Sequence, residues 1–215
     1  MTILGTLMEF FPFLHATSLF ICGGLAFFFL GNAQYNLTYL AVACLLFLFN
    51  LYILPPLFFR LHNRVFILKS GFSDFSKHVY SPWWGGHQIQ KIYISLPFLE
   101  SLLRLIPGLY SGWLRLWGAK IGKCIYWTPN VEIVDRSLIE LGDYVVFGHR
   151  SAICSHVITP RKGGLLLYVG PIVIGDGVFV GAEAKIGPGA RIDQGVFLPY
   201  GTVVSVNSHV KASIA

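Results

Sequence analysis

Charged residues are scarce in this chain of 215 residues. Asp, Glu, Lys and Arg make up 12% of the sequence, whereas an ordinary soluble domain carries about a quarter. From Phe10 to Phe59 none of the four occurs. This is not the composition of an ordinary soluble protein, and the uncharged stretch is long enough for two membrane-spanning helices of roughly 20 residues each.

A polar break, GNAQYN at residues 31 to 36, divides the uncharged stretch. We therefore expect one transmembrane helix over residues 11 to 30 and a second over residues 37 to 59, joined by a short turn. Pro55 and Pro56 should kink the second helix near its end. Two alternatives remain, a buried pair of core helices and a signal peptide; against the signal peptide, no positive charge precedes the first apolar run.

Basic residues are absent from the break but follow the second predicted helix at Arg60, His62, Arg64 and Lys69. The positive-inside rule therefore places the end of that helix, and with it both chain termini, in the cytoplasm. The formal net charge of +6 suits an anionic membrane surface. These features predict a multi-pass protein of the inner (cytoplasmic) membrane.

Two further kinds of pattern are missing from the sequence. The four cysteines, Cys22, Cys44, Cys124 and Cys154, show no CxxC spacing and are expected to be small buried hydrophobes in a reducing compartment. No basic helix and no stripe of alternating aromatic and basic residues is present, which argues against a nucleic-acid partner.

The second half of the chain contains apolar residues spaced by six. They are Ile174, Val180, Ile186, Ile192, Leu198 and Val204, and the same frame occurs earlier at Ile121, Leu141, Phe147 and Ile153. Neither a helix, which repeats near 3.6 residues, nor a strand, which repeats every two, explains this period. It is typical of hexapeptide β-helix repeats, in which three short strands form one coil.

The repeat has an interruption and a connector before it. Ile153 and Ile174 are separated by 21 residues, which is no multiple of six, so residues 157 to 170 are predicted to leave the coil as a loop. Upstream, residues 81 to 120 carry four tryptophans and are divided by Pro107-Gly108. They are expected to form interfacial amphipathic helices on the bilayer, a connector that caps the β-helix, or both.

The predicted organisation has three parts: a transmembrane hairpin (residues 1 to 62), an interfacial and connecting segment (63 to 120), and a β-helix (121 to 215). Within the last two, the motifs LRLWGAKIG, LGDYVVFG, ICSH and PIVIGDGVFVGAEAKIGPGARI resemble the hexapeptide-repeat acyltransferases. The likeness is greatest to bacterial acetyltransferases that modify sugars and exopolysaccharides, including the colanic acid type, and covers residues 114 to 206. It implies a left-handed parallel β-helix and a homotrimer that binds acyl-CoA between neighbouring subunits.

Acyl transfer to a hydroxyl or amine needs a base for the acceptor's proton, and imidazole suits that role near neutral pH. His156 stands where the family has its catalytic histidine. The resemblance also makes Asp135 a candidate to orient the imidazole and Asn130 a candidate polar residue of the site. Val157 departs from the family, which often has Asp or Pro there, and this suggests a less polar acceptor pocket.

The resemblance further implies that the late coils bind the pantetheine arm of CoA largely through backbone atoms, which gives Ala182, Tyr200 and Ser205 as candidates. Tyr200 is bulky for such a position. Arg161 and Lys162, beside two glycines in the predicted loop, are candidates for binding the CoA phosphates. A solvated loop tip is the alternative for this pair.

Together these features predict a membrane-anchored acyltransferase that moves an acyl group, expected to be acetyl, from acyl-CoA to a membrane-associated, lipid or sugar acceptor. One alternative is a noncatalytic trimeric scaffold anchored by the hairpin. Another is a γ-class carbonic anhydrase, which shares this fold and binds zinc through a His-x4-His pair. That pair is absent from the sequence, so no metal is expected.

Overall fold

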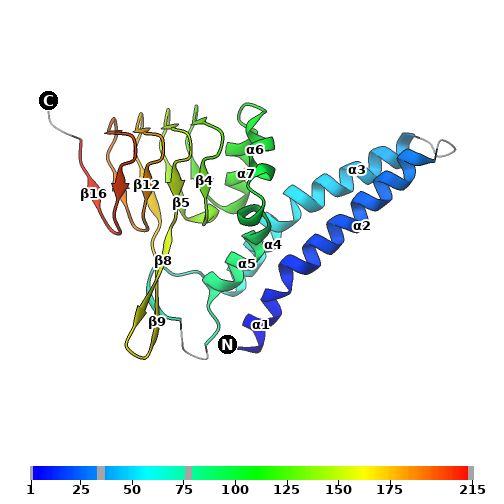
Figure 1. Ribbon diagram of the computed structural model, residues 1–215, viewed down its shortest axis with the longest axis horizontal. Coiled ribbons are helices and arrows are strands. Elements are labelled where there is room, and N and C mark those ends of the chain that lie inside the picture. Colours follow the sequence, from blue (N-terminus) through cyan, green and yellow to red (C-terminus); the bar gives the residue numbers. More distant parts are fainter. Residues whose placement is uncertain (1, 33–36, 76–78, 213–215) are drawn as a thin grey trace. The chain divides into compact units, whose positions relative to one another are not determined.

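The computed structural model describes residues 2–32, 37–75 and 79–212. These form two compact units (Figure 1). The first contains Met1–Ile67 and Tyr80–Ile92, and the second contains Leu68–Val79 and Tyr93–Ala215. The segment predicted as a separate middle part, residues 63 to 120, forms no compact unit of its own and is divided between these two.

Helices alone build the first unit. They are α1 (Ile3–Glu9), α2 (Phe11–Gly31), α3 (Leu37–Tyr52), α4 (Leu54–Val65) and most of α5 (Pro82–Ser95). Helices α2 and α3 lie side by side along their length. The helical segments Ile3–Gly31 and Leu37–Val65 are each 29 residues long and apolar enough to cross a membrane. Most of the predicted turn at residues 31 to 36 lies outside the described residues.

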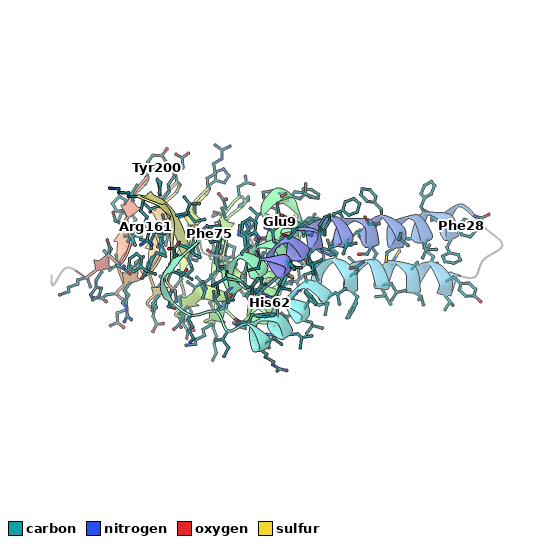
Figure 2. The ribbon with its side chains drawn as sticks, turned by 90° about the horizontal axis from the view of Figure 1, so that it is seen from below. Glu9, Phe28, His62, Phe75, Arg161 and Tyr200 are labelled. Carbon is teal, nitrogen blue, oxygen red and sulfur yellow. The ribbon has the colours of Figure 1, made fainter. Side chains whose placement is uncertain are left out.

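Most large side chains of the helix pair point outward, as Phe28 does in Figure 2. Proline interrupts the second segment where expected, because α3 ends at Tyr52 and α4 starts with prolines in its first turn. Between the two segments, the imidazole Nε2 of His15 lies 3.0 Å from the carbonyl oxygen of Asn50. The Asn50 amide donates to Ser18 Oγ at 2.9 Å. Polar groups inside this apolar pair therefore bond across it.

The second unit is a β-helix of three parallel sheets. Their strand orders are β16-β13-β10-β5-β2, β14-β11-β6-β3 and β15-β12-β7-β4, here called sheets B, C and D. The strands are β2 (Lys120–Ile121), β3 (Tyr126–Trp127), β4 (Glu132–Ile133), β5 (Ile139–Leu141), β6 (Val146–Phe147), β7 (Ala152–Ile153), β10 (Ile172–Ile174), β11 (Phe179–Val180), β12 (Lys185–Ile186), β13 (Arg191–Ile192), β14 (Phe197–Leu198), β15 (Val203–Val204) and β16 (His209–Val210). The predicted left-handed parallel β-helix is confirmed.

The six-residue period is explained by what fills the coil and what fits at its corners. Every apolar residue of the period is buried in the interior, from Ile121 to Val204. The residue that follows must be small because the next coil passes close by. A Cβ on Gly175, for example, would lie 2.5 Å from the backbone nitrogen of Gln194. Burial on one side and close backbone packing on the other therefore fix the repeat.

The period fails twice, both times at the corner between sheets D and B. Eight residues instead of six separate Ile133 from Leu141, and the extra length forms a 3₁₀ turn, η1 (Arg136–Leu138). One coil later, the predicted loop leaves the β-helix as a hairpin of β8 (His156–Arg161) and β9 (Gly164–Val169). Strand β1 (Gly71–Asp74) pairs antiparallel with β9. We call this interrupted edge the D–B corner.

Helices α6 (Phe98–Arg104) and α7 (Leu109–Trp117) cover the first coil of the β-helix. Trp113 and Trp117 are 3% and 1% exposed. They pack inside the unit, as expected for a capping connector. Between the two helices, Leu105 and Ile106 are 76% and 58% exposed.

Candidate functional site

Asp135 and His156 meet at the D–B corner. The Nδ1 atom of His156 lies 2.7 Å from Oδ2 of Asp135, and only 16% and 4% of the two side chains is exposed. Because a carboxylate can only accept, Nδ1 carries the proton in this hydrogen bond. The opposite nitrogen, Nε2, is then the one that can take up a proton.

The two interruptions of the repeat bring this pair together. Asp135 immediately precedes η1, and His156 is the first residue of β8, one coil later at the same corner. The backbone N–H of Ser155 donates to the same Oδ2 atom at 3.1 Å, and the Ser155 hydroxyl donates to the carbonyl oxygen of Leu138 at 3.2 Å. The later coil thus holds the Asp135 carboxylate through two groups, and Ser155 also ties it to the turn that follows Asp135.

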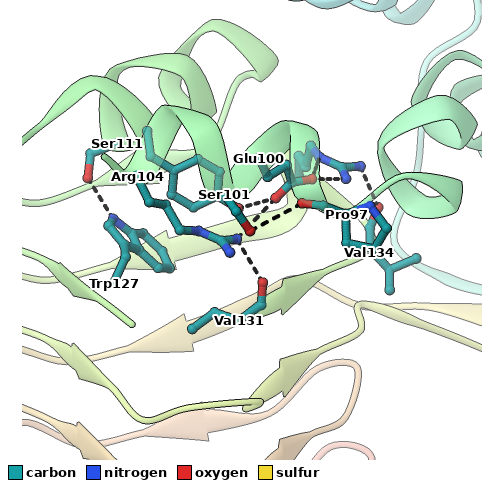
Figure 3. Close-up of polar contacts among 10 residues, drawn as sticks. Pro97, Glu100, Ser101, Arg104, Ser111, Trp127, Val131 and Val134 are labelled. Carbon is teal, nitrogen blue, oxygen red and sulfur yellow. Dashed lines mark hydrogen bonds and ion pairs between the residues drawn. The ribbon is translucent and has the colours of Figure 1, made fainter. Parts of the chain in front are cut away.

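A buried ion network supports the turn that carries Asp135. Glu100 of α6 accepts hydrogen bonds from Arg136, the next residue after Asp135, and from Tyr110. Its other cationic partner is Arg104, at 3.2 Å, which also donates to the carbonyl oxygen of Val131 at 2.7 Å (Figure 3). Arg136 itself lies near the rings of Tyr93, Trp113 and Trp117. The D–B corner is therefore tied to the cap by a buried carboxylate.

The surroundings of His156 favour its protonated form. Burial lowers the pKa of its imidazole. The hydrogen bond to Asp135, the neighbouring Cys154 and the charge of Asp135 outweigh burial and raise the pKa to about 10. A charged imidazolium next to a buried carboxylate is the expected state near neutral pH. Proton uptake by Nε2 therefore requires that the imidazole first lose this proton.

Cys154 belongs to this site, although the sequence suggested only a buried hydrophobe. Its Sγ lies 3.6 Å from His156 Nδ1, and the thiol donates to the carbonyl oxygen of His156 at 3.3 Å. The donor atoms of Asp135, Cys154 and His156 all lie within 4.8 Å of one another, so this group could hold a metal ion. The signal available in the sequence was the position of Cys154, two residues before the candidate base.

Asn130 is not brought to the His156–Asp135 pair. It precedes β4, whereas Asp135 follows the same strand, so the two lie at opposite ends of it. Asn130 is exposed at a corner and has a φ of 61°. Register places it in the same column as Arg150 of the next coil. This geometry makes it a corner residue and leaves no contact with the imidazole.

The candidate residues for CoA lie on two different corners. Ala182 and Tyr200 follow sheet C strands on successive coils, and the Ala182 carbonyl accepts from the Gly201 N–H at 2.9 Å. Tyr200 is exposed at the surface of the β-helix (Figure 2), and its hydroxyl donates to Glu183 at 2.7 Å. Ser205 is exposed at the D–B corner, the corner of His156.

The candidate phosphate-binding pair lies at the tip of the β8–β9 hairpin. Lys162 is exposed there. The guanidinium of Arg161 donates to Asp74 of β1 at 2.8 Å, so it also closes the three-stranded sheet. The hairpin is tied to the late coils as well, because the hydroxyl of Tyr168 donates to Asn207. Sequence reasoning did not anticipate either contact, since each joins residues far apart in the chain.

The proteins that resemble this chain in sequence are acetyltransferases. No family model matches the chain. YvoF of Bacillus subtilis (strain 168), a candidate acetyltransferase, is 27% identical over 139 residues, which is 57% of this chain and 77% of YvoF. WcaF of Escherichia coli (strain K12), a candidate colanic acid biosynthesis acetyltransferase, is 28% identical over 121 residues. That alignment spans 47% of this chain and 63% of WcaF, just under two thirds of its length.

Two solved structures resemble part of the chain. A hexapeptide-repeat-containing acetyltransferase from Vibrio cholerae has a TM-score of 0.40 and 16% identity, with 55% of this chain and 83% of that chain covered. A galactoside acetyltransferase in complex with coenzyme A has a TM-score of 0.37 and 18% identity, with 52% and 74% covered. The resemblance predicted from the motifs is confirmed: over about half its length, this chain is similar to bacterial acetyltransferases of the hexapeptide-repeat kind.

Proposed function

We propose that this protein is an acyl-CoA-dependent acyltransferase, with acetyl-CoA as donor and a hydroxyl or amine as acceptor. The observation that carries the proposal is the His156–Asp135 pair, a buried imidazole–carboxylate hydrogen bond at the corner where the repeat is interrupted. The similarity to YvoF and WcaF supports the same reaction class. A scaffold that only trimerises has no need of this pair.

Transfer is direct and passes through no covalent enzyme intermediate. Neutral His156 takes the acceptor's proton at Nε2 while the acceptor oxygen or nitrogen forms a bond to the thioester carbonyl carbon. A backbone N–H of a late coil stabilises the tetrahedral oxyanion. The carbon–sulfur bond then breaks, and the CoA thiolate leaves and takes the proton from the imidazolium. Asp135 keeps the ring in the orientation and tautomer that this step needs.

The helical unit anchors the enzyme in the inner membrane with the β-helix in the cytoplasm. Two segments of sufficient length and apolar character support the anchor, and the basic residues after the second support the orientation. CoA is found on the same side. Because the anchor and the site belong to one chain, we expect the acceptor to be a lipid, a lipid-linked sugar or another amphiphile.

The enzyme acts as a homotrimer, and sheet C supports this assembly. Phe179 and Phe197 point outward from paired positions on β11 and β14, with their rings 5.4 Å apart. Phe197 is 64% exposed. Neighbouring exposed aromatic side chains on a rigid sheet are typical of a surface that another subunit covers. The mass of the detergent-solubilised protein, corrected for bound detergent, should equal three chains.

Turnover of acetyl-CoA tests the proposed function. In detergent, the native protein should release free thiol only when an acceptor from a panel of lipids, lipid-linked sugars and soluble sugars is added. Equal turnover of a soluble sugar in the absence of membrane or detergent would contradict the membrane-derived acceptor. Failure to bind CoA at all would favour the anchored scaffold.

The pH dependence of turnover tests the role of Asp135. Because the pKa of His156 is raised to about 10, kcat/KM should rise about tenfold per pH unit through the neutral range. Asp135→Asn removes the charge that stabilises the imidazolium, so the pKa falls and the rising limb should move to lower pH. The plateau should also fall, because the amide holds the ring less well. An unchanged limb would exclude the proposed pairing.

A further inference from the structure

A second candidate site lies at the cap of the β-helix, away from the D–B corner. A cavity of about 370 Å³ opens where α7 meets the first coil. Arg104, Arg115 and Lys123 line it, and none of the described residues in its lining carries a carboxylate. The reaction proposed above uses none of these side chains.

Helix α7 begins in this cavity. Gly108, whose φ of 78° suits glycine, precedes the helix, and no side chain caps the first turn. The N–H groups at a helix N-terminus lack helical partners and carry the positive end of the helix dipole. Together with nearby basic side chains, such an end favours a phosphate group.

Arg104 places a buried positive charge in the wall of the cavity. Its side chain is 5% exposed, and its terminal nitrogen bonds to Glu100 and to the Val131 carbonyl. Its Nε, however, is buried and has no hydrogen-bond partner among the described residues. A buried guanidinium N–H without an acceptor is costly. The guanidinium also lies over the ring of Tyr110, with its central carbon 4.3 Å from the ring centroid, and its positive charge attracts an anion to the cavity whose wall it forms.

The walls of the cavity are held in place without a ligand. Arg115 donates to the carbonyl oxygens of Ile121 and Gly122 at 2.7 to 3.0 Å. The indole N–H of Trp127 donates to Ser111 at 2.9 Å, as Figure 3 shows. Lys123 is exposed, so its ammonium group can move to meet a ligand. The cavity is therefore pre-formed by these contacts and adjustable at Lys123.

Apolar side chains lie beside the cationic cavity. Ile106 lines it and is 58% exposed, and the neighbouring Leu105 is 76% exposed. A free phosphate ion would leave these apolar side chains exposed to water, whereas acyl chains attached to a phosphate would cover them. We propose that this cavity binds the phosphate group of an anionic amphiphile, with the apolar chains lying over Leu105 and Ile106.

Binding can be measured on the full chain in an uncharged detergent by isothermal titration calorimetry. The probes are dihexanoyl phosphatidylglycerol, phosphatidylcholine with the same chains, and inorganic phosphate. We expect dihexanoyl phosphatidylglycerol to bind at least tenfold more tightly than the other two probes. Lys123→Glu should weaken its binding about tenfold, with Lys123→Gln intermediate. Lys211→Glu, the same charge change at an exposed position far along the β-helix, should leave binding within twofold.

Leu105→Ser separates the two sources of phosphate. This substitution should weaken the binding of phosphatidylglycerol and leave the binding of inorganic phosphate unchanged. If inorganic phosphate binds as tightly as the lipid, the lipid is not the ligand. If neither binds, or if Lys123→Glu and Lys211→Glu act alike, the cavity is not the site. Unfolding temperatures matched to the native protein show that each variant is folded, and acetyl-CoA turnover is measured separately.

Discussion

His156→Ala should abolish acyl transfer while leaving acetyl-CoA binding intact. General base catalysis typically contributes 10²- to 10⁴-fold, so we expect kcat to fall by about a thousandfold. The dissociation constant of acetyl-CoA should change by less than about threefold, because the proposed role of His156 is towards the acceptor. Acceptor-dependent thiol release gives the first quantity and equilibrium dialysis gives the second.

His149 provides a matched control. It is also a histidine of the β-helix, at the corner between β6 and β7, but it is exposed, and its backbone carbonyl accepts from the Glu183 N–H. His149→Ala should therefore keep turnover within about twofold. Retention of activity in His156→Ala, or an equal loss in both variants, would refute the assignment of the base. His156→Gln fills the same space and excludes a packing effect.

The β-helix could be predicted from the sequence because its constraints are strict and local. Each six-residue repeat needs an apolar residue inside and a small residue at the corner, so Ile174 and Gly175 carry the same information as Ile186 and Gly187. The interruption at the D–B corner could also be predicted in part, because residues that break a fixed period must leave the coil. His156 stands at that break, and the family resemblance indicated its role.

The supporting contacts could not be predicted because they join segments with no shared period. Glu100 and Arg136 are 36 residues apart, and α6 resembles an interfacial helix in its sequence. Buried and membrane-facing tryptophans have similar neighbours, so the composition around Trp113 and Trp117 could not separate the two. Strand β1 lacks an alternating apolar pattern, and its position is set by pairing with β9. Packing, rather than local preference, decides these elements.

Removing Glu100 should be the most destabilising single change in the β-helical unit. Glu100→Ala leaves Arg136 and Arg104 buried without their counter-charge and takes away the acceptor of the Tyr110 hydroxyl. Breaking a buried pair in this way costs about 3–5 kcal/mol. Urea unfolding in detergent, followed by tryptophan fluorescence, measures the loss, because Trp113 and Trp117 lie beside Arg136.

Two further variants test whether the effect comes from the buried charges. Glu140→Ala breaks an exposed pair with Lys120 and should cost at most about 1 kcal/mol. Arg136→Met retains the packing against the rings and leaves Glu100 bonded to Arg104 and Tyr110, so it should cost less than Glu100→Ala. If Glu100→Ala cost no more than Glu140→Ala, the cap would not depend on this network, and the position of Asp135 would rest on the two coils alone.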